Sequence, residues 1–478
     1  MLLGLDLGTG SVKALLLDEK GRVVAEGSRS YPVEAPRPGW AETPPAAWWE
    51  AVLEVTRSLD ADHRKRVKAL GLSGQMHGVV LCNEQGRPLR PAILWADTRS
   101  REQLAVYQTL DREQRERLAN PVAAGMAGPS LLWLERFEPD SYRAARWALQ
   151  PKDWLRLQLT GEVFAEPSDA SATLLFDLRE DRWALDIAEA LGLRGDWLAP
   201  LVPSRRVAGK LRGGVAAELG LPAGIPVAAG AADAAASALG SGLVHAGQVQ
   251  VNIGTAMQIF AIREAPVIDP SLRTHLYRSA LDDWYAMAAM QNAGIALEWV
   301  RRILGFSWQE MYAEAFRVPP GCDGVTFLPY LTGERTPHLD PQARGAWSGL
   351  TLSHDRAHLA RAAFEGVAFA LRDGLKALEE AGIAAEVLRL AGGGTLQPAW
   401  RQLLADVLGK PLHAAAVPAA SARGAAILAG LAVGIFSGAE AASLSAESEP
   451  VAAPRAQPEL EEAFVRFRAL YPALSQRP

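Results

Sequence analysis

Residues 2–18 read Leu-Leu-Gly-Leu-Asp6-Leu-Gly8-Thr9-Gly10-Ser-Val-Lys-Ala-Leu-Leu-Leu-Asp. One apolar segment enters the Gly-Thr-Gly turn, a second leaves it, and residues 22–28 continue as a third, which together predict three strands. Glycines supply positive φ to such turns and leave backbone N–H groups uncovered, an arrangement that suits a phosphate. Asp6 ends the first strand, and a carboxylate beside a phosphate indicates an intervening Mg²⁺. Alone, the motif is more typical of an ordinary hairpin with a surface aspartate.

A second copy of the pattern changes this balance. Residues 248–260 read Gln-Val-Gln-Val-Asn-Ile-Gly254-Thr255-Ala256-Met-Gln-Ile-Phe, again a strand, a Gly-Thr turn and a strand. Two such hairpins predict a duplicated domain in which two phosphate loops face one nucleotide. The arrangement resembles the actin-like ATPase fold. We therefore expect an α/β protein of two actin-like (ribonuclease H-like) domains with a cleft between them.

Composition sets the limits of size and compartment. The 478 residues are too many for one core and predict two domains, 1–245 and 246–478. A hydrophobic content of 49%, a charged content of 22% and a net charge of −5 describe an ordinary globular protein without a basic footprint for nucleic acid.

Two cysteines without metal-ligand spacing favour a reducing cytoplasm. With Asp6 in the first strand and only a short glycine-containing apolar run at 424–436, we expect neither a signal peptide nor a membrane partner.

Periodicity and punctuation place the main elements. Apolar spacing predicts helices, and turn residues predict a loop over 327–350 and a linker over 447–457. The helices are expected at 45–59, 97–118, 151–160, 293–303, 357–381, 398–408, 423–431 and 460–474.

A short loop, residues 75–78, follows the buried strand predicted at 67–72. Ligands of open α/β sheets lie at the carboxyl ends of strands, so Met76 could pack on the carbon face of a sugar while His77 donates to one of its hydroxyls. The competing interpretation is a core histidine at a strand end, which is the commoner use of an isolated histidine.

Asp233 follows the predicted strand 226–229 and begins the helix predicted at 234–239. One interpretation is a simple N-cap. The other is a catalytic base, which the helix N-terminus would keep ionised.

Residues Gly392, Gly393 and Gly394, between a strand and a helix, offer bare backbone on which an adenosine could lie. No Walker A sequence is present, and a strand rather than a helix follows Gly8-Thr9-Gly10, which argues against a Rossmann site.

Several longer motifs carry a specific resemblance. Residues 345–350 (Gly-Ala-Trp-Ser-Gly-Leu), with 358–366, resemble the C-terminal signature of the FGGY carbohydrate kinases. Within that family, the Met-His-Gly loop, 94–99, 151–153 and 329–338 look most like the bacterial xylulokinases. The similarity covers almost the whole chain, although 329–338 could equally serve packing and turns.

The resemblance implies ATP-dependent, Mg²⁺-assisted phosphorylation of a ketopentose, D-xylulose foremost, in the cytoplasm, and leaves a homodimer open. It implies the following roles: Asp233 as general base; Met76, His77 and Asp233 as sugar ligands; Asp6 as the metal-linked acid; Gly8, Thr9, Gly10, Gly254 and Thr255 as phosphate loops; Gly392, Gly393 and Gly394 as the adenosine loop.

Three departures keep alternatives open. Ala234 replaces the usual asparagine, Ser130 a usual lysine and Ala256 a usual serine. Another sugar or polyol kinase of the family, acting on ribulose, glycerol, gluconate or an unusual ketose, therefore remains an alternative. An actin-like ATPase that binds protein partners and a catalytically silent sugar sensor are two further ones.

Overall fold

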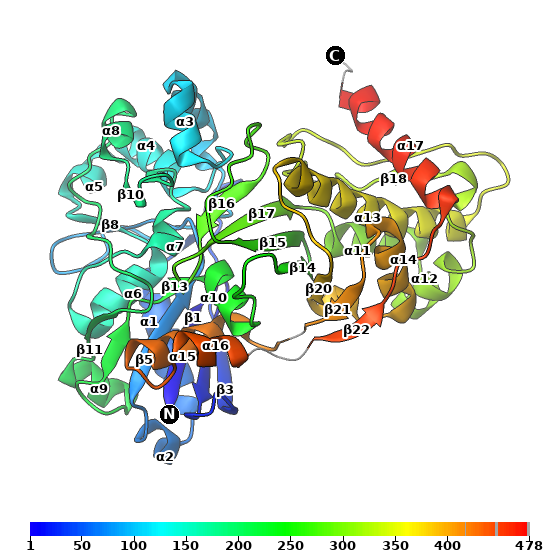
Figure 1. Cartoon of the computed structure of the whole chain (residues 1–478). Helices are drawn as coiled ribbons and strands as arrows, with labels where there is room; N and C mark the ends of the chain where they lie inside the picture. Colours follow the sequence, from blue (N-terminus) through cyan, green and yellow to red (C-terminus); the bar gives the residue numbers. More distant parts are fainter. Residues whose placement is uncertain (416, 445–447, 476–478) are drawn as a thin grey trace.

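The computed structural model describes residues 1–415, 417–444 and 448–475 and contains two seven-stranded mixed sheets (Figure 1). The first sheet has the order β11 (Val207–Lys210), β12 (Pro226–Ala228), β5 (Ala69–Gly74), β1 (Leu2–Leu7), β2 (Ser11–Leu17) and β3 (Val23–Ser30), with β13 (Ala231–Ala232) also on β5. The second has the order β16 (His275–Arg278), β17 (Trp284–Met290), β15 (Met257–Arg263), β14 (Val249–Ile253), β20 (Leu388–Ala391), β21 (Leu412–Ala414) and β22 (Glu449–Ala452).

The two predicted hairpins lie at the centres of these sheets. β1 pairs antiparallel with β2 and parallel with β5, and all its residues are buried. β14 likewise pairs antiparallel with β15 and parallel with β20. A strand covered on both faces needs continuous apolar sequence, which explains the run of leucines in β1. The prediction of two strand–turn–strand copies is confirmed.

Helices cover the sheets; in the first one, α15 packs on the central strands β1 and β5, and α1 packs on β2 and the edge strand β3. They are α1 (Pro45–Ser58), α2 (Ala61–Arg64), α3 (Arg112–Leu118), α4 (Ala127–Phe137), α5 (Pro139–Ala144), α6 (Pro151–Thr160), α7 (Pro167–Ala170), α8 (Leu185–Ala190), α9 (Gly213–Leu219), α10 (Asp233–Gly240), α11 (Gly294–Leu304), α12 (Trp308–Ala315), α13 (Arg356–Glu380), α14 (Pro398–Leu408), α15 (Ala420–Ala432), α16 (Gly438–Ser443) and α17 (Pro458–Ser475).

Four short strand pairs complete the fold. They are β4 (Glu42–Thr43) with β7 (Ala92–Ile93), β6 (Val80–Cys82) with β8 (Trp147–Leu149), β9 (Phe176–Asp177) with β10 (Arg182–Trp183), and β18 (Thr326–Leu328) with β19 (Ala346–Ser348).

Three predicted elements differ from the structure. The helix expected over 97–118 is a 3₁₀ helix, Arg99–Thr109, followed by α3, because Asp111 caps a new helix. The loop expected over 327–350 begins and ends in the paired strands β18 and β19. The linker expected over 447–457 contains β22, whose pairing with β21 is a tertiary contact that composition does not reveal; residue 447 lies outside the described residues.

Helix α15 lies in the chain between β21 and β22 of the second sheet but packs on the first sheet (Figure 1). It approaches β1 and β5 so closely that a Cβ added at Gly4 or Gly71 would lie 2.0 or 1.9 Å from a backbone oxygen of α15. At Gly424 of α15 itself, an added Cβ would lie 1.9 Å from the carbonyl oxygen of Ala236 in α10. One hydrophobic cluster continues from this helix pair to the inner face of the second sheet. The domain boundary near residue 245 stays a prediction, and α15 is a later segment that joins the two sheets.

No helix within the described part of the chain has the length and apolarity that crossing a bilayer demands.

The α10–α15 contact gives a testable expectation for stability. Gly424→Ala should lower the free energy of unfolding by about 1–3 kcal/mol, the usual cost of overpacking, since the new methyl group meets backbone atoms that cannot rotate away. Gly214→Ala in α9 is the matched control because its added Cβ meets nothing within 4 Å. Urea unfolding of both variants provides the measurement. Equal stability of the two variants would contradict the close approach.

Candidate active site

Three neighbouring parallel strands end at one edge of the first sheet and bring the predicted sugar-side residues together. Leu7 of β1 is in register with Gly74 of β5, and Gly74 is in register with Ala232 of β13. Beyond these ends lie the loop at Gly8, the Met76-His77 loop and Asp233. Residues far apart in sequence thus meet because parallel strands share one carboxyl edge.

Asp233 is the first residue of α10, and Ala232 is its N-cap, so the N-cap interpretation was wrong by one residue. Its carboxylate accepts a hydrogen bond from the backbone N–H of Ala234 at 2.7 Å. Burial, followed by the nearby negative charge of Asp6, raises the pKa of Asp233 to about 7. The expectation that the helix N-terminus keeps this carboxylate fully ionised is therefore wrong, because desolvation and a like charge outweigh the helix dipole.

Asp6 is buried at the end of β1 and accepts a hydrogen bond from Ser73 Oγ at 3.0 Å. Burial raises its pKa, which Ser73 and Lys13 partly oppose. The described residues hold no group of three or more metal-ligating side chains. Mg²⁺ usually takes only one or two carboxylates together with water and phosphate oxygens, so two mutually repelling carboxylates fit that ion.

His77 has a φ of 69° and hydrogen-bonds through Nδ1 to the carbonyl of Ala172 at 2.8 Å. Burial lowers its pKa to about 4, so the ring is neutral at physiological pH. Because a carbonyl only accepts, Nδ1 carries the proton and Nε2 is an acceptor. The expected donation from His77 does not fit this tautomer, because Nε2 can only accept a hydrogen bond. Met76 is buried beside it, with its sulfur 3.9 Å from the hydroxyl of Tyr285 in the second sheet.

The loop Gly8-Thr9-Gly10 is held in place from several sides. Gln75 Nε2 donates to the carbonyl oxygen of Gly8 at 3.2 Å. The hydroxyl of Tyr31 donates to the same oxygen. Trp95 Nε1 donates to Thr9 Oγ1 at 2.8 Å. Neither glycine has a positive φ, so the expectation from turn geometry does not apply, and a Cβ at Gly10 would meet nothing within 4 Å. What the glycines leave is bare, accessible backbone.

The second loop and the glycine run also converge. The N–H groups of Gly294 and Ile295, at the start of α11, donate to the carbonyls of Gly254 and Thr255 at 3.0 and 3.1 Å. Strands β14 and β20 run parallel and end side by side. At Gly392, φ is 99° and an added Cβ would lie 2.3 Å from the carbonyl oxygen of Ile253, so only glycine fits.

A buried ionic cluster behind the sugar-side residues escaped the sequence analysis. Lys152 Nζ lies 2.8 Å from Asp153, 3.0 Å from Glu166 and 2.9 Å from Asp169, all fully buried. Ser168, between the last two, accepts a hydrogen bond from the N–H of Ala232 at 2.9 Å. The cluster thereby fixes the turn that presents Asp233. The charged run 151–153 hinted at it, but only the fold supplies its partners.

Arg335 and Trp95 are two further residues at this site that sequence reasoning placed only within motifs. The guanidinium carbon of Arg335 lies 6.0 Å from the centre of the Trp95 ring. Its charge contributes to lowering the pKa of His77. Arg335 lies in the chain between β17 and β20 of the second sheet, and Trp95 lies between β5 and β11 of the first, so the pair spans both domains.

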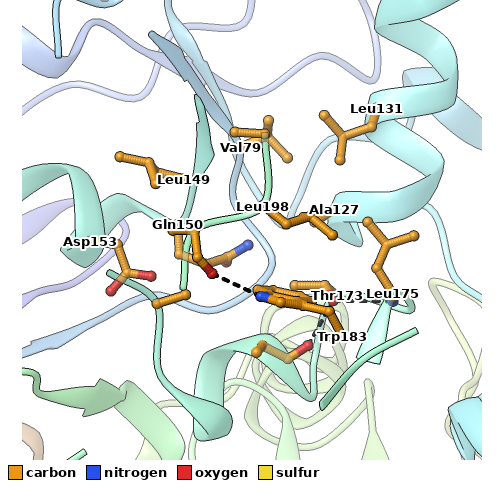
Figure 2. Close-up of a pocket in the computed structure, with 14 residues that line it drawn as sticks. Val79, Ala127, Leu131, Leu149, Gln150, Asp153, Thr173, Leu175, Trp183 and Leu198 are labelled. Atoms are coloured by element: carbon orange, nitrogen blue, oxygen red, sulfur yellow. Dashed lines mark hydrogen bonds between the residues drawn. The ribbon is translucent and has the colours of Figure 1, made fainter. Parts of the chain in front are cut away.

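A separate small cavity of about 20 Å³ lies behind this site in the first domain (Figure 2). Its lining is mostly apolar, with Gln150, Asp153 and Thr173 as polar members. Gln150 Oε1 and Asp153 Oδ2 have no hydrogen-bond partner. A space of this size holds about one water molecule, so it is too small for a sugar.

Comparison with known proteins agrees with this geometry. The N-terminal domain model of the FGGY family of carbohydrate kinases matches residues 1–240, and the C-terminal domain model matches 249–433. The xylulose kinase of Escherichia coli is 39% identical over 415 residues, 86% of each chain. The gluconokinase of Bacillus subtilis is 30% identical over 98% of this chain and 94% of its own. The xylulose kinase structure from Rhodospirillum rubrum superposes with a TM-score of 0.92 at 32% identity over 99% of both chains.

These matches confirm the predicted resemblance and the predicted α/β fold of two actin-like domains. They also confirm that the protein is a sugar kinase, an enzyme class whose phosphate donor is ATP. The chain belongs to the FGGY family of carbohydrate kinases.

Proposed function

We propose that this kinase transfers the γ-phosphoryl group of ATP to D-xylulose and forms D-xylulose 5-phosphate. The relatives named as xylulose kinases support the substrate, and the position of Asp233 beside Asp6 at the end of β13 supports the site. That juxtaposition is the observation on which the proposal rests.

Asp233 acts as the general base. The hydroxyl oxygen of the sugar forms a bond to phosphorus as the bond from phosphorus to the leaving ADP oxygen breaks, and the hydroxyl proton passes to the Asp233 carboxylate. A base with a pKa of about 7 is well matched to neutral pH, since a useful fraction is ionised and its proton affinity is still high.

The loops at Gly8-Thr9-Gly10 and Gly254-Thr255 hold the phosphates through backbone N–H groups, and Gly392 to Gly394 carry the adenosine. Asp6 would hold Mg²⁺, which would supply neutralisation of the phosphate charge when bound. Transfer of this kind depends mainly on alignment and charge stabilisation, so the rigid anchoring of the first loop by Gln75 and Trp95 is part of the catalytic apparatus.

His77 and Met76 position the sugar. The unprotonated Nε2 of His77 accepts a hydrogen bond from a sugar hydroxyl, and the Met76 thioether packs against the carbon skeleton. Tyr285, 3.9 Å from the Met76 sulfur, belongs to the second sheet. Relative movement of the domains therefore changes the wall of the sugar pocket, which suits a kinase that must exclude water before transfer.

Gluconate is the second candidate substrate. Ala234 removes an amide that xylulokinases usually place beside the base, and a gluconokinase matches nearly the full length of the chain. An actin-like ATPase leaves Asp233 and His77 without a role, and a silent sugar sensor leaves the base Asp233 without one.

A panel of sugars in a coupled ADP assay tests the substrate. We expect D-xylulose to give the highest kcat/KM among D-xylulose, D-ribulose, L-ribulose, glycerol and gluconate. A higher kcat/KM for gluconate would favour the second candidate. ADP release that no acceptor stimulates would instead indicate an ATPase.

Asp233→Asn should lower kcat about 10²–10⁴-fold, because the amide cannot accept the proton. Asp282→Asn, at an exposed aspartate paired with Arg205, serves as the matched control and should keep its activity. Steady-state kinetics with the best sugar of the panel gives the comparison. Near-normal turnover of Asp233→Asn would remove the aspartate from the mechanism.

The raised pKa of Asp233 also predicts a pH effect on stability without ligands. From its usual pKa of 3.8 up to about 7, the folded protein keeps a proton that the unfolded chain has released, so Asp233 stabilises the fold below this window and that contribution is lost as pH rises through it. Asp233→Asn removes the titration. Its stability relative to the wild type should therefore increase between pH 4 and pH 7 and then level off, as measured by urea unfolding in EDTA. A difference independent of pH would contradict the assigned shift.

A further inference from the structure

The loop over residues 329–338 is fixed by buried contacts that do not involve the side chain of Arg335. Glu334 is 2% exposed, and its Oε1 accepts hydrogen bonds from the N–H of Gln291 at 2.7 Å and of Arg335 at 2.8 Å. Asn292 Nδ2 donates to the carbonyl of Gly333 at 2.7 Å. The backbone just before Arg335 is thus attached to the end of β17.

Thr336 fixes the other side of the same residue. Its hydroxyl donates to the carbonyl of Arg273 at 2.8 Å and accepts from the N–H of Ala289 at 3.2 Å. Because hydrogen bonds hold both Glu334 and Thr336, the loop determines the direction in which the Arg335 side chain points. Such bracing is more than a turn requires and is typical of a loop that presents one side chain.

The guanidinium of Arg335 lies over Trp95, whose indole N–H holds Thr9 of the first phosphate loop. The positive charge of Arg335 also contributes to lowering the pKa of His77 and opposes the rise in the pKa of Tyr277 that burial causes. Yet among the described residues it has no carboxylate or carbonyl within hydrogen-bond distance. A half-buried guanidinium with an aromatic neighbour and no anion retains its full set of donors for a ligand.

In the proposed mechanism, the anion that comes near the Arg335 guanidinium is the transferring phosphoryl group. A ketose carries no charge, whereas the phosphoryl group moves from the nucleotide toward a sugar beside His77. Arginine binds phosphate oxygens through two parallel N–H donors, and these bonds are stronger than neutral ones.

We propose that Arg335 is a further catalytic residue, which extends from the second domain to Trp95 beside the first phosphate loop and donates hydrogen bonds to the phosphoryl group during its transfer and in the product. This inference rests on the proposed kinase mechanism and on an uncharged acceptor, but not on which uncharged sugar the acceptor is. Because Arg335 and Asp233 come from different domains, the site is complete only when both domains hold the substrates.

The test compares Arg335→Met and Arg335→Lys with Arg344→Met, whose arginine lies in the same segment but is exposed and binds only nearby backbone carbonyls and Gln342. Each is assayed with the best sugar of the panel and with its phosphorylated product as inhibitor. We expect Arg335→Met to lower kcat about 10²–10³-fold, as loss of a donor to transition-state charge does. The inhibition constant of the product should rise about tenfold or more, with little change in the KM of the sugar.

Arg335→Lys should fall between Arg335→Met and the wild type, because lysine keeps the charge but not the paired donors. Arg344→Met should match the wild type. A higher KM for the sugar with an unchanged product inhibition constant would overturn the proposal and place Arg335 on the sugar instead. Loss of activity that parallels loss of unfolding stability in both Arg335 variants would make the residue structural. A wild-type protein that phosphorylates a different uncharged sugar changes the proposed substrate only, since the same readouts apply to that sugar. If gluconate is the best substrate, a higher KM for gluconate in Arg335→Met with an unchanged product inhibition constant would place Arg335 on the gluconate carboxylate and overturn the proposal.

Discussion

The repulsion between Asp6 and Asp233 is the interaction on which the rest of this site depends. The carboxylates lie near the ends of β1 and β13, the two strands that flank β5, and burial together with the charge of Asp6 raises the pKa of Asp233 to about 7. Two carboxylates in this arrangement are costly to the fold unless a cation or a proton joins them. The same cost makes Asp233 a strong proton acceptor and Asp6 a suitable metal neighbour, so function and instability have one physical origin.

The surrounding structure holds these groups in place by two means. Behind them, Lys152 with its three buried carboxylates fixes the segment that leads through Ser168 to Ala232. Beside them, α15 lies against glycines of β1 and β5 with no room for a side chain. The first device is electrostatic and the second steric. The ionic cluster acts at the strand ends, which are the parts of a sheet that position ligands, and α15 fixes the middle of β1 and β5.

Contacts between the domains give the site its second half. Tyr285 contacts Met76, Ser421 Oγ donates to the carbonyl of Asp233 at 3.2 Å, and Arg335 lies over Trp95. Each contact joins a residue of the sugar-side strands to a later segment of the chain. In the proposed mechanism, a substrate held between these groups contacts both domains. Transfer can then depend on the presence of both substrates.

The sequence by itself determined the fold class, because the two Gly-Thr hairpins and their apolar strands are local patterns. It also singled out Asp6, His77 and Asp233, since each follows an apolar strand at a break in periodicity. It could not determine the protonation of His77 or Asp233, because the Ala172 carbonyl and the charge of Asp6 come from distant parts of the chain. Nor could it separate Arg335 from the packing residues around it, because a motif does not show which side chains find partners. Those properties depend on desolvation and long-range contacts, which only the tertiary structure decided.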